Sequence, residues 1–413
     1  MATLDVSADA SQPANPQSAP SPSTSALPVI SIGTRRSLLA LKQTDIVEAA
    51  LKKAWPDRDY AIHAMATMGD KNQVTPLHEM GAKALWTHEL EALLLEGRLD
   101  LVVHSLKDMP TQLPASLSIG AIFPREDPRD ALVMRPSLLP SSTSPPRNSH
   151  DLLSTLPPGS VIGTSSVRRS AQLVRLYPHL TFASVRGNVG TRLSKLDAPD
   201  SPYSALILAA AGLLRLGLGD RITALLSSRE GGILHAVGQG ALGIEVREAD
   251  GDISRILGKV GCERTTRMCL AERSLMRTLE GGCSVPIGVE TEWVDAVRGA
   301  GDGEEALTDV AAKPAPEDQN QSNRTVEGKE NGTEVTSGQK DDSAAGILTF
   351  RAIVVSLDGK EAAEGEMTRR IASREDADQF GWDMARLLVE RGADKILEKI
   401  NLNRNIIHEQ GDA

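Results

Sequence analysis

The chain has 413 residues and a formal net charge of −10, and 40% of its residues are hydrophobic but only 3% are aromatic. This length favours two or three domains with real cores. The acidic balance and the few aromatic rings argue against a nucleic-acid-binding protein, which needs broad basic surfaces or stacking platforms. The three cysteines match no zinc-ligand spacing, and no apolar run is long enough to span a membrane. We therefore expect no metal, no nucleic-acid partner and no membrane partner.

The alternation of strand-like and helix-like segments predicts an α/β fold. Residues 1–28, rich in Ala, Ser and Pro, are expected to be a disordered tail. The predicted strands are 29–33, 60–66, 99–105, 161–163, 180–185 and 205–210, with helices at 36–54 and 85–96 and a return crossing at 237–246. This order indicates mainly parallel sheets, where ligands bind beyond the carboxyl ends of strands.

Two segments differ in composition from the rest. Residues 136–160 are rich in Pro and Ser and predict a linker or surface insertion. Residues 298–346 are polar and too poor in large apolar side chains to bury a core, so we expect a disordered insertion.

The last part of the chain predicts a hairpin followed by a helix. Residues 347–356 and 363–372 are strand-like, and a helix is expected at roughly 374–391. Ser373, with Asp376 three positions later, has the pattern of a capping box at the start of that helix.

Residues 152–196 contain no Asp or Glu. They hold six basic residues: Arg168, Arg169, Arg175, Arg186, Arg192 and Lys195. Two glycine-containing turns, GTSSVRR at 163–169 and RGNVGTR at 186–192, punctuate this window. Free N–H groups at a helix start and arginine forks both bind carboxylates or phosphates. The window predicts a basic cleft for a small acidic molecule; the alternative is a solvated basic face.

An ionisable cluster ends one predicted strand. The segment HSLKDMP (104–110) carries His104, Lys107 and Asp108 just before a proline. Groups at this end of a strand are where α/β proteins place reactive side chains. A carboxylate among many cations stays ionised, so Asp108 can stabilise a cation or relay a proton. The alternative is that Asp108 caps the turn ahead of Pro110.

Three further turns carry candidate residues. GTRRS (33–37) holds adjacent arginines, and MGAKALW (80–86) places Lys83 before a helix. LEGGCSVPIG (279–288) places Cys283 after two glycines, where a thiol near arginines can form a thiolate. The alternative for Cys283 is a buried, inert cysteine.

Seven motifs occur together in one order: IGTRRSLLAL, HSLKDMP, REDPRDALV, GTSSVRR, VRGNVGTRLSKLD, AVGQGALGIE and LEGGCSVPIG. In these motifs the chain resembles the hydroxymethylbilane synthase family, also called the porphobilinogen deaminase family. The resemblance covers roughly residues 29–296 and is looser beyond them. The insertion at 298–346 is unlike the compact family pattern.

The resemblance implies two similar lobes with mixed, mainly parallel sheets, like those of periplasmic binding proteins, and a smaller α+β third domain. The implied divisions are 29–127 plus 237–258 for the aspartate lobe, 128–236 for the arginine-rich lobe, and 259–413 for the cysteine domain. The implied reaction deaminates four porphobilinogen molecules and joins them head to tail into hydroxymethylbilane, releasing ammonia, in haem biosynthesis. A dipyrromethane cofactor, attached to Cys283 as a thioether, would prime the chain.

The resemblance also implies a role for each matching residue. Asp108 would be catalytic. The implied cofactor-binding residues are Cys283, Lys83, Ser37, Ser165, Ser166, Arg168, Arg169 and Arg186. The implied substrate-binding residues are Arg35, Arg36, Arg168 and Arg192. Because each pyrrole ring brings two carboxylates, a growing chain needs many fixed cations.

The main alternative is a two-lobe protein that binds a small polycarboxylate without catalysis. It would explain the arginines, but not Asp108 or a glycine-flanked Cys283. Under the family reading we expect a cytoplasmic monomer, since three cysteines are typical of a reducing compartment.

Overall fold

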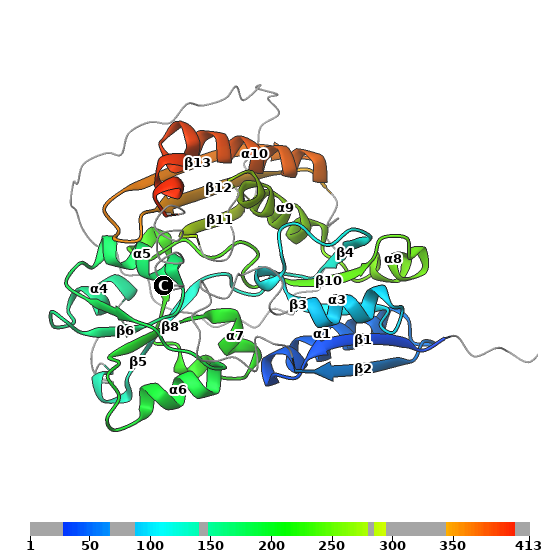
Figure 1. Ribbon diagram of the computed structural model, residues 1–413, viewed down its shortest axis with the longest axis horizontal. Helices are drawn as coiled ribbons and strands as arrows, with labels where there is room; N and C mark the ends of the chain where they lie inside the picture. The colour runs from blue at the N-terminus through cyan, green and yellow to red at the C-terminus, as the bar shows by residue number, and fades with distance from the viewer. Residues whose placement is uncertain (1–27, 67–86, 140–147, 280–284, 295–343, 401–413) are drawn as a thin grey trace, which may run out of the picture.

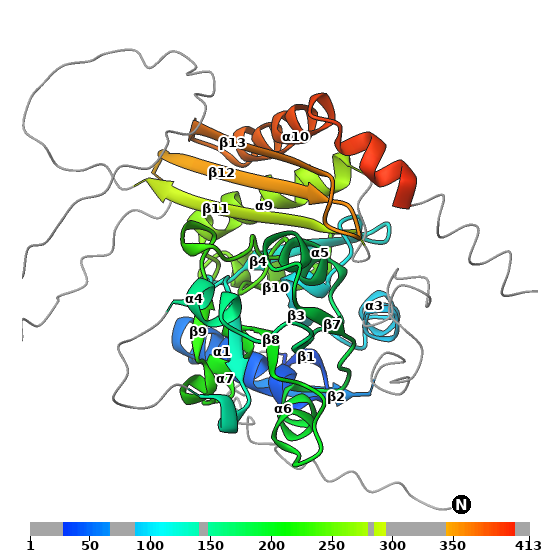
Figure 2. The same cartoon turned by 90° about the vertical axis from the view of Figure 1, so that its left-hand side faces the viewer.

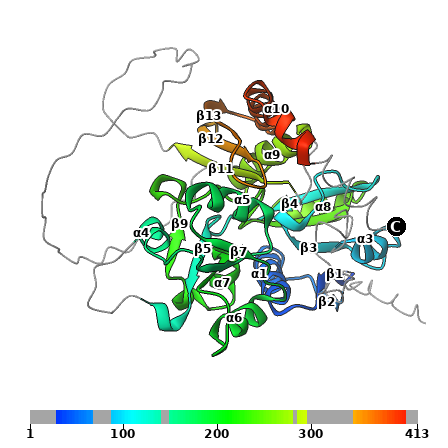
Figure 3. The same ribbon diagram turned by 60° about the vertical axis from the view of Figure 1, so that its left-hand side comes forward.

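The computed structural model describes residues 28–66, 87–139, 148–279, 285–294 and 344–400. Within these ranges the chain forms three β-sheets, two with five strands and one with three. Each sheet is packed against helices, and the three units lie against one another, as Figures 1 and 3 show.

The first lobe is built on β1 (Ile30–Arg35), β2 (Tyr60–Met65), β3 (Leu101–Ser105), β4 (Leu117–Ile122) and β10 (Leu242–Arg247). The strand order is β2-β1-β3-β10-β4, with β1 parallel to β2 and β3 and with β10 antiparallel to β3 and β4. Its helices are α1 (Leu38–Ala54), α3 (His88–Leu95), α8 (Gly251–Leu257) and the 3₁₀ turn η1 (Leu106–Asp108). Apolar side chains of α1 and α8 pack on one face of the sheet, and those of α3 on the other.

The second lobe is built on β5 (Asp130–Met134), β6 (Val161–Gly163), β7 (Thr181–Ala183), β8 (Ala205–Ala209) and β9 (Ala224–Leu226). Its order is β7-β6-β8-β5-β9, with β6 parallel to β7 and β8 and with β5 antiparallel to β8 and β9. Its helices are α4 (Ser149–Ser154), α5 (Val167–Leu176), α6 (Val189–Asp197) and α7 (Ala210–Arg215), with 3₁₀ turns η2 (Pro136–Leu138), η3 (Gly219–Arg221) and η4 (Ser228–Glu230). Helices α4 and α5 cover one face, and α6 and α7 the other.

The two lobes share one plan, which confirms the predicted α/β fold with mixed sheets. In each sheet two parallel pairings are followed by two antiparallel ones. The strand that is antiparallel to both of its neighbours, β10 in the first lobe and β5 in the second, comes from a distant part of the chain. The chain therefore crosses between the lobes twice, at 123–129 and again at 227–241.

The third domain has an antiparallel sheet of β11 (Ile287–Val294), β12 (Gly346–Val355) and β13 (Ala362–Ile371). Helices α9 (Glu263–Thr278) and α10 (Arg374–Glu390) pack together on one face of it (Figure 2). Phe350 and Phe380 meet in this core with ring centroids 5.7 Å apart. We propose that the three sheets mark the three domains expected from the sequence.

The predicted hairpin and capping box are confirmed. The Ser373 hydroxyl accepts a bond from the Asp376 N–H at 3.1 Å, and the Asp376 carboxylate accepts one from the Ser373 N–H at 3.1 Å. Both partners lie within one helical turn, so the local sequence specifies them. Most of the expected insertion, up to residue 343, lies outside the described residues.

The prediction for residues 136–160 is wrong in part. Residues 149–154 form α4, whose first turn is capped by Asn148: its side chain accepts a bond from the Asp151 N–H at 2.9 Å. Leu152 and Leu153 are buried in the core of the second lobe. The Pro and Ser composition does not indicate this short helix, because the helix is stabilised by the tertiary packing of its two leucines. Residues 140–147 lie outside the described residues.

The two crossings are bonded to each other. Arg125 donates from Nε to the Gln239 carbonyl at 2.8 Å, and the Glu126 N–H donates to the Gly240 carbonyl at 3.1 Å. Gly240 has a φ of +89°, and a Cβ there would lie 2.2 Å from the Glu126 carbonyl oxygen. Any larger residue at Gly240 would strain its own backbone and push the crossings apart.

A buried ion cluster closes the junction of the lobes. The Asp130 carboxylate, fully buried at the start of β5, accepts bonds from Arg168 Nη1 at 2.8 Å and from Arg169 Nη2 at 2.7 Å. Gln239 Nε2 donates to the same carboxylate at 2.9 Å. Burial by itself would raise the pKa of Asp130, but the two arginines hold it well below its usual range.

A second buried ion pair ties the third domain to the crossings. The Glu272 carboxylate of α9 receives both terminal nitrogens of Arg125, at 2.7 and 3.0 Å. It also accepts the Gly238 N–H at 2.8 Å and the Thr291 hydroxyl at 2.6 Å. One side chain thus connects α9, β11 and both crossings.

Asp130→Asn should lower the free energy of unfolding by about 3–5 kcal/mol, because it leaves two buried guanidinium groups without their carboxylate. Since the pKa of Asp130 is depressed, the stability it contributes is present at neutral pH and lost only as the pH falls below about 4. Urea unfolding measures the change. Asp127→Asn is the matched control: it removes the partner of the partly exposed Arg129 in the same crossing, which should cost at most about 1 kcal/mol. Equal losses in the two variants would contradict the assigned role of Asp130.

Candidate active site

The predicted site residues of the first lobe gather beyond the ends of β1 and β3. A small cavity of about 50 Å³ lies there. Its polar lining consists of Arg35, Ser37, Gln43, His104, Ser105 and Asp108. Gln43 and Ser105 hold each other, since Gln43 Nε2 donates to the Ser105 hydroxyl at 2.8 Å and the hydroxyl lies 3.1 Å from Gln43 Oε1. The exposed Arg36 is not part of this lining.

Asp108 is presented by the 3₁₀ turn η1. The buried Leu106 anchors the turn, because its N–H donates to the Ala241 carbonyl at 3.0 Å. Among the described residues, none forms a hydrogen bond with the Asp108 carboxylate. The alternative that Asp108 caps its own turn is therefore not supported, and the carboxylate stays available to a ligand.

Lys107 connects the same turn to the junction of the lobes. Its Nζ lies 3.4 Å from Gln239 Oε1, and Gln239 in turn donates to Asp130 and to the Pro128 carbonyl. Burial, together with Arg169 and Arg168, lowers the pKa of Lys107 to about 8, while Asp108 and Asp130 oppose the shift. An amine with this pKa exchanges its proton in the physiological range.

The serines of the second lobe shape the turn before α5. Ser166 is its N-cap, and its hydroxyl accepts a bond from the Arg169 N–H at 3.4 Å. Ser165 donates from Oγ to the Val185 carbonyl at 2.7 Å and lies 3.0 Å from the Ser184 hydroxyl. Ser165 therefore holds the turn after β6 against the turn after β7.

Arg168 and Arg169 are buried and turned toward Asp130. Arg168 also donates to the Leu234 carbonyl at 2.7 Å, and Arg169 to the Ile207 carbonyl at 2.9 Å. Two guanidinium groups share one carboxylate, so the cluster retains one excess positive charge. Both residues were predicted as ligand-binding groups, and the structure adds a structural partner for them.

Arg186 lies in the turn before α6, and Arg192 lies within that helix. The Asn188 side chain caps this helix by accepting the Thr191 N–H at 2.9 Å, and Arg192 donates from Nε to the Gly187 carbonyl at 2.7 Å. Burial lowers the pKa of Arg192 to about 10, as do Arg169 and Arg186, while Asp108 opposes them. These electrostatic contacts place Arg192 of the second lobe near Asp108 of the first.

The structure thus brings most of the predicted site together. Asp108, Lys107, Arg169, Arg186 and Arg192 interact electrostatically across the junction of the lobes. Cys283 and Lys83 lie outside the described residues. Sequence reasoning missed Asp130 and Gln239, although both lie in quoted motifs, because nothing local shows that their side chains turn into the junction.

The two described cysteines do not form a disulfide with each other. Burial raises the pKa of the Cys269 thiol to about 12, which keeps it protonated. Cys262 is the N-cap of α9, where its sulfur lies 3.4 Å from the Thr265 N–H.

The described residues contain no group of three or more His, Cys, Asp or Glu side chains suited to a metal ion. None of their helices is both long and apolar enough to cross a membrane.

These features define a two-lobed α/β protein with a third domain and a basic site at the junction of its lobes. A family model described as porphobilinogen deaminase, dipyromethane cofactor binding domain, matches residues 30–255. A second one, described as porphobilinogen deaminase, C-terminal domain, matches residues 266–322. The chain belongs to the porphobilinogen deaminase family.

Curated relatives agree along most of the chain. The porphobilinogen deaminase of Yarrowia lipolytica is 47% identical over 383 residues, which cover 92% of this chain and 95% of that protein. The porphobilinogen deaminase of Candida albicans is 44% identical over 382 residues, covering 91% and 94%. Among solved structures, the alkanesulfonate-binding protein SsuA from Xanthomonas axonopodis pv. citri is 14% identical with a TM-score of 0.31, covering 61% of this chain and 77% of that one. This structural similarity is too weak to indicate a function.

Lys107 should titrate with a midpoint near pH 8 in the ligand-free protein, about two units below an ordinary lysine. Nitrogen-15 NMR of labelled lysine side chains measures it, and the signal missing from Lys107→Met assigns the resonance. Asp108→Asn should lower the midpoint further, because it removes a negative charge that favours the protonated amine. A midpoint above pH 10, or no response to Asp108→Asn, would contradict this account of the site.

Proposed function

We propose that this chain is a hydroxymethylbilane synthase. It deaminates four porphobilinogen molecules and joins them head to tail into the linear tetrapyrrole hydroxymethylbilane, releasing ammonia, as a step of haem biosynthesis. The observation that carries the proposal is the Asp108 carboxylate: it forms no hydrogen bond within the described residues, lines a cavity with Arg35, and lies near Arg192 of the opposite lobe.

Asp108 is the proposed catalytic residue. When ammonia leaves porphobilinogen, positive charge develops on the pyrrole ring, and an ionised carboxylate beside the ring nitrogen stabilises it. The same carboxylate can accept the proton released when the new carbon–carbon bond is complete. Lys107 and Arg192 lie close enough to interact electrostatically with the Asp108 carboxylate.

The residues present fit a dipyrromethane cofactor. Its acidic side chains require cations, and the junction offers Lys107, Arg186, Arg192 and the excess charge of the Asp130 cluster. The residues proposed to hold it are Ser37, Lys83, Ser165, Ser166, Arg168, Arg169 and Arg186, with attachment to Cys283. When bound, the cofactor supplies the pyrrole carbon that attacks the first substrate molecule.

The proposed substrate contacts come from both lobes. Arg35 lines the cavity with Asp108, and the Gly187 carbonyl orients the Arg192 fork. Arg36 follows Arg35 on the exposed side of the same turn, and Arg168 reaches the junction from α5. A cation from each lobe would hold the two carboxylates of porphobilinogen on opposite sides, with the ring beside Asp108.

Attachment at Cys283 is supported by the other two cysteines. Cys269 is fully buried and stays protonated, and Cys262 is engaged at the start of α9. A thioether needs an accessible thiolate, which the buried Cys269 does not provide, and the Cys262 sulfur already accepts the Thr265 N–H. We further propose that the protein is a cytoplasmic monomer.

Cys283→Ala should yield protein without a bound dipyrromethane and without activity, because a methyl side chain cannot form the thioether. Intact-protein mass spectrometry detects the adduct directly. Cys262→Ala and Cys269→Ala are the controls and should keep both the adduct and the activity. An adduct mapped to Cys262 or Cys269 would contradict the proposed attachment, and an unmodified wild-type protein would favour the binding-protein alternative.

Asp108→Asn should lower the rate of porphobilinogen consumption by about 10²–10⁴-fold, because an amide can neither stabilise the cation by charge nor take up a proton. Its fold, followed by circular dichroism, should be unchanged, since the carboxylate makes no hydrogen bond within the described residues. Asp220→Asn removes the same charge from an exposed position outside the cavity and should leave the rate unchanged. A near-native rate in Asp108→Asn would refute the catalytic role.

A further inference from the structure

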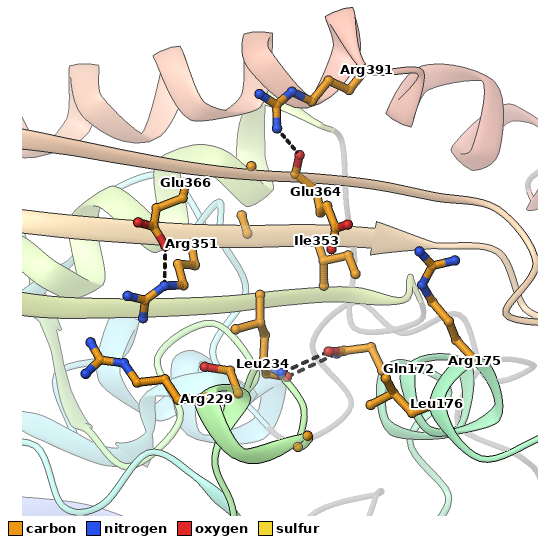
Figure 4. A pocket seen from close by; sticks show the side chains of 15 residues that line it. Gln172, Arg175, Leu176, Arg229, Leu234, Arg351, Ile353, Glu364, Glu366 and Arg391 are labelled. Atoms are coloured by element: carbon orange, nitrogen blue, oxygen red, sulfur yellow. Dashed lines mark hydrogen bonds and ion pairs between the residues drawn. The ribbon is translucent and has the colours of Figure 1, made fainter. Parts of the chain in front are cut away.

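A second cavity lies between the second lobe and the third domain and shares no residue with the cavity at Asp108. Its volume is about 490 Å³, within the range of small-molecule sites. As Figure 4 shows, α5 and the crossing segment beside it form one wall, and β12 and β13 form the other. The proposed catalytic residues do not reach it.

Part of the lining is apolar. Ile353 projects from the face of β12 opposite to the core that holds Phe350, and it packs with Leu234 of the crossing. Leu176, at the end of α5, lines the same cavity and is 44% exposed. A large apolar side chain left exposed inside a concave site offers a surface for an aromatic ring.

The charged part of the lining has an excess of cations. Four arginines, Arg175, Arg229, Arg351 and Arg391, face two glutamates, Glu364 and Glu366. Arg351 is paired with Glu366 and with Glu290 outside the lining, and Arg229 is paired with Glu292, also outside it. Once these ion pairs are set aside, the charged lining consists of two cations, Arg175 and Arg391, and one carboxylate, Glu364.

Arg175 and Arg391 have no carboxylate partner among the described residues. Arg391 donates from Nη1 only to the backbone carbonyl of Glu364, and Arg175 makes no side-chain hydrogen bond to the described part of the chain. Figure 4 shows Arg175 extending from α5 and Arg391 from the end of α10 toward the strands between them. The two unmatched cations therefore reach one cavity from two different domains.

The cavity also adjoins the crossing that joins the lobes. Gln172 of α5 donates from Nε2 to the Leu234 carbonyl at 3.1 Å and accepts the Leu234 N–H at 2.9 Å. Both residues are part of the lining, and the Leu234 carbonyl also receives Arg168. A molecule bound here would contact α5, the crossing and the third domain at once.

We propose that this cavity is a binding site for an amphipathic organic anion, an aromatic or heteroaromatic ring that bears one acidic group. The ring lies on Leu176, Leu234 and Ile353, and the acidic group is attracted to the cations Arg175 and Arg391 of the same lining. Arginine forks bind carboxylate and sulfonate oxygens in pairs, and apolar walls hold the ring. Glu364 disfavours a second acidic group on the same ligand. The proposal is independent of the reaction proposed above.

Fluorescence titration of the full-length holoenzyme with 8-anilinonaphthalene-1-sulfonate tests the site. Its neutral analogue, N-phenyl-1-naphthylamine, has the same rings without the sulfonate and serves as the charge control. We expect saturable binding of one sulfonate probe per chain, about tenfold tighter than binding of the neutral analogue. Equal affinity for the two probes would overturn the assignment of an anion site.

Variants of the lining locate the probe. Arg175→Gln and Arg391→Gln should each weaken sulfonate binding about tenfold. Glu364→Gln should strengthen it by removing a repulsive charge. Arg370→Gln is the matched control, because Arg370 is an exposed arginine of β13 outside the cavity, and it should have no effect.

Two results would overturn the proposal. One is an unchanged affinity in both Arg175→Gln and Arg391→Gln. The other is displacement of the probe by excess porphobilinogen, which would place the probe at the junction of the lobes instead. Circular dichroism of each variant confirms that a loss of binding is not a loss of fold.

Discussion

The arrangement of the lobes depends on one buried carboxylate shared by two buried arginines. Asp130 begins the strand with which the chain enters the second lobe, and it meets Arg168 and Arg169 at the start of α5. Buried charges are costly unless they are paired and fully hydrogen-bonded, so this cluster has one favourable geometry. Gln239, from the opposite crossing, completes it. The position of α5 relative to both crossings follows from that geometry.

The same cluster conditions the chemistry beside it. Burial is the main cause of the lowered pKa values of Lys107 and Arg192. Arg168 and Arg169 of the cluster add to it at Lys107, and Arg169 adds to it at Arg192. Cations held together in a partly desolvated site repel one another, and this repulsion is relieved when acidic groups enter. Because these cationic side chains are already held in place, the site favours a ligand with several carboxylates.

The third domain is joined to this junction through Glu272 and not through a broad apolar interface alone. Its carboxylate binds Arg125 and the Gly238 N–H, so α9 contacts the two crossings where they meet. The segment at 234–237 also pairs with β11 through His235 and Val289. The third domain therefore makes polar contacts with both crossings as well as packing against the lobes.

The sequence by itself determined the local structure and the kind of chemistry. Strand and helix periodicity, the capping box of Ser373 and Asp376, and the hairpin before it are all local patterns, because each involves neighbours within a few positions or a short turn. The window without Asp or Glu is visible in the sequence, and its positive charge indicated an acidic ligand. The motif set identified the family. Tertiary structure decided which charges are structural: the partner of Arg168 and Arg169 is 38 and 39 positions away, and no local pattern marks Asp130 as that partner. Part of a Pro/Ser-rich stretch forms α4 because Leu152 and Leu153 are buried in the core of the second lobe. The tertiary structure also places Arg175 and Arg391 at one cavity. Such choices follow from packing between distant segments, where burial sets the cost of each charge and the available partner decides its role.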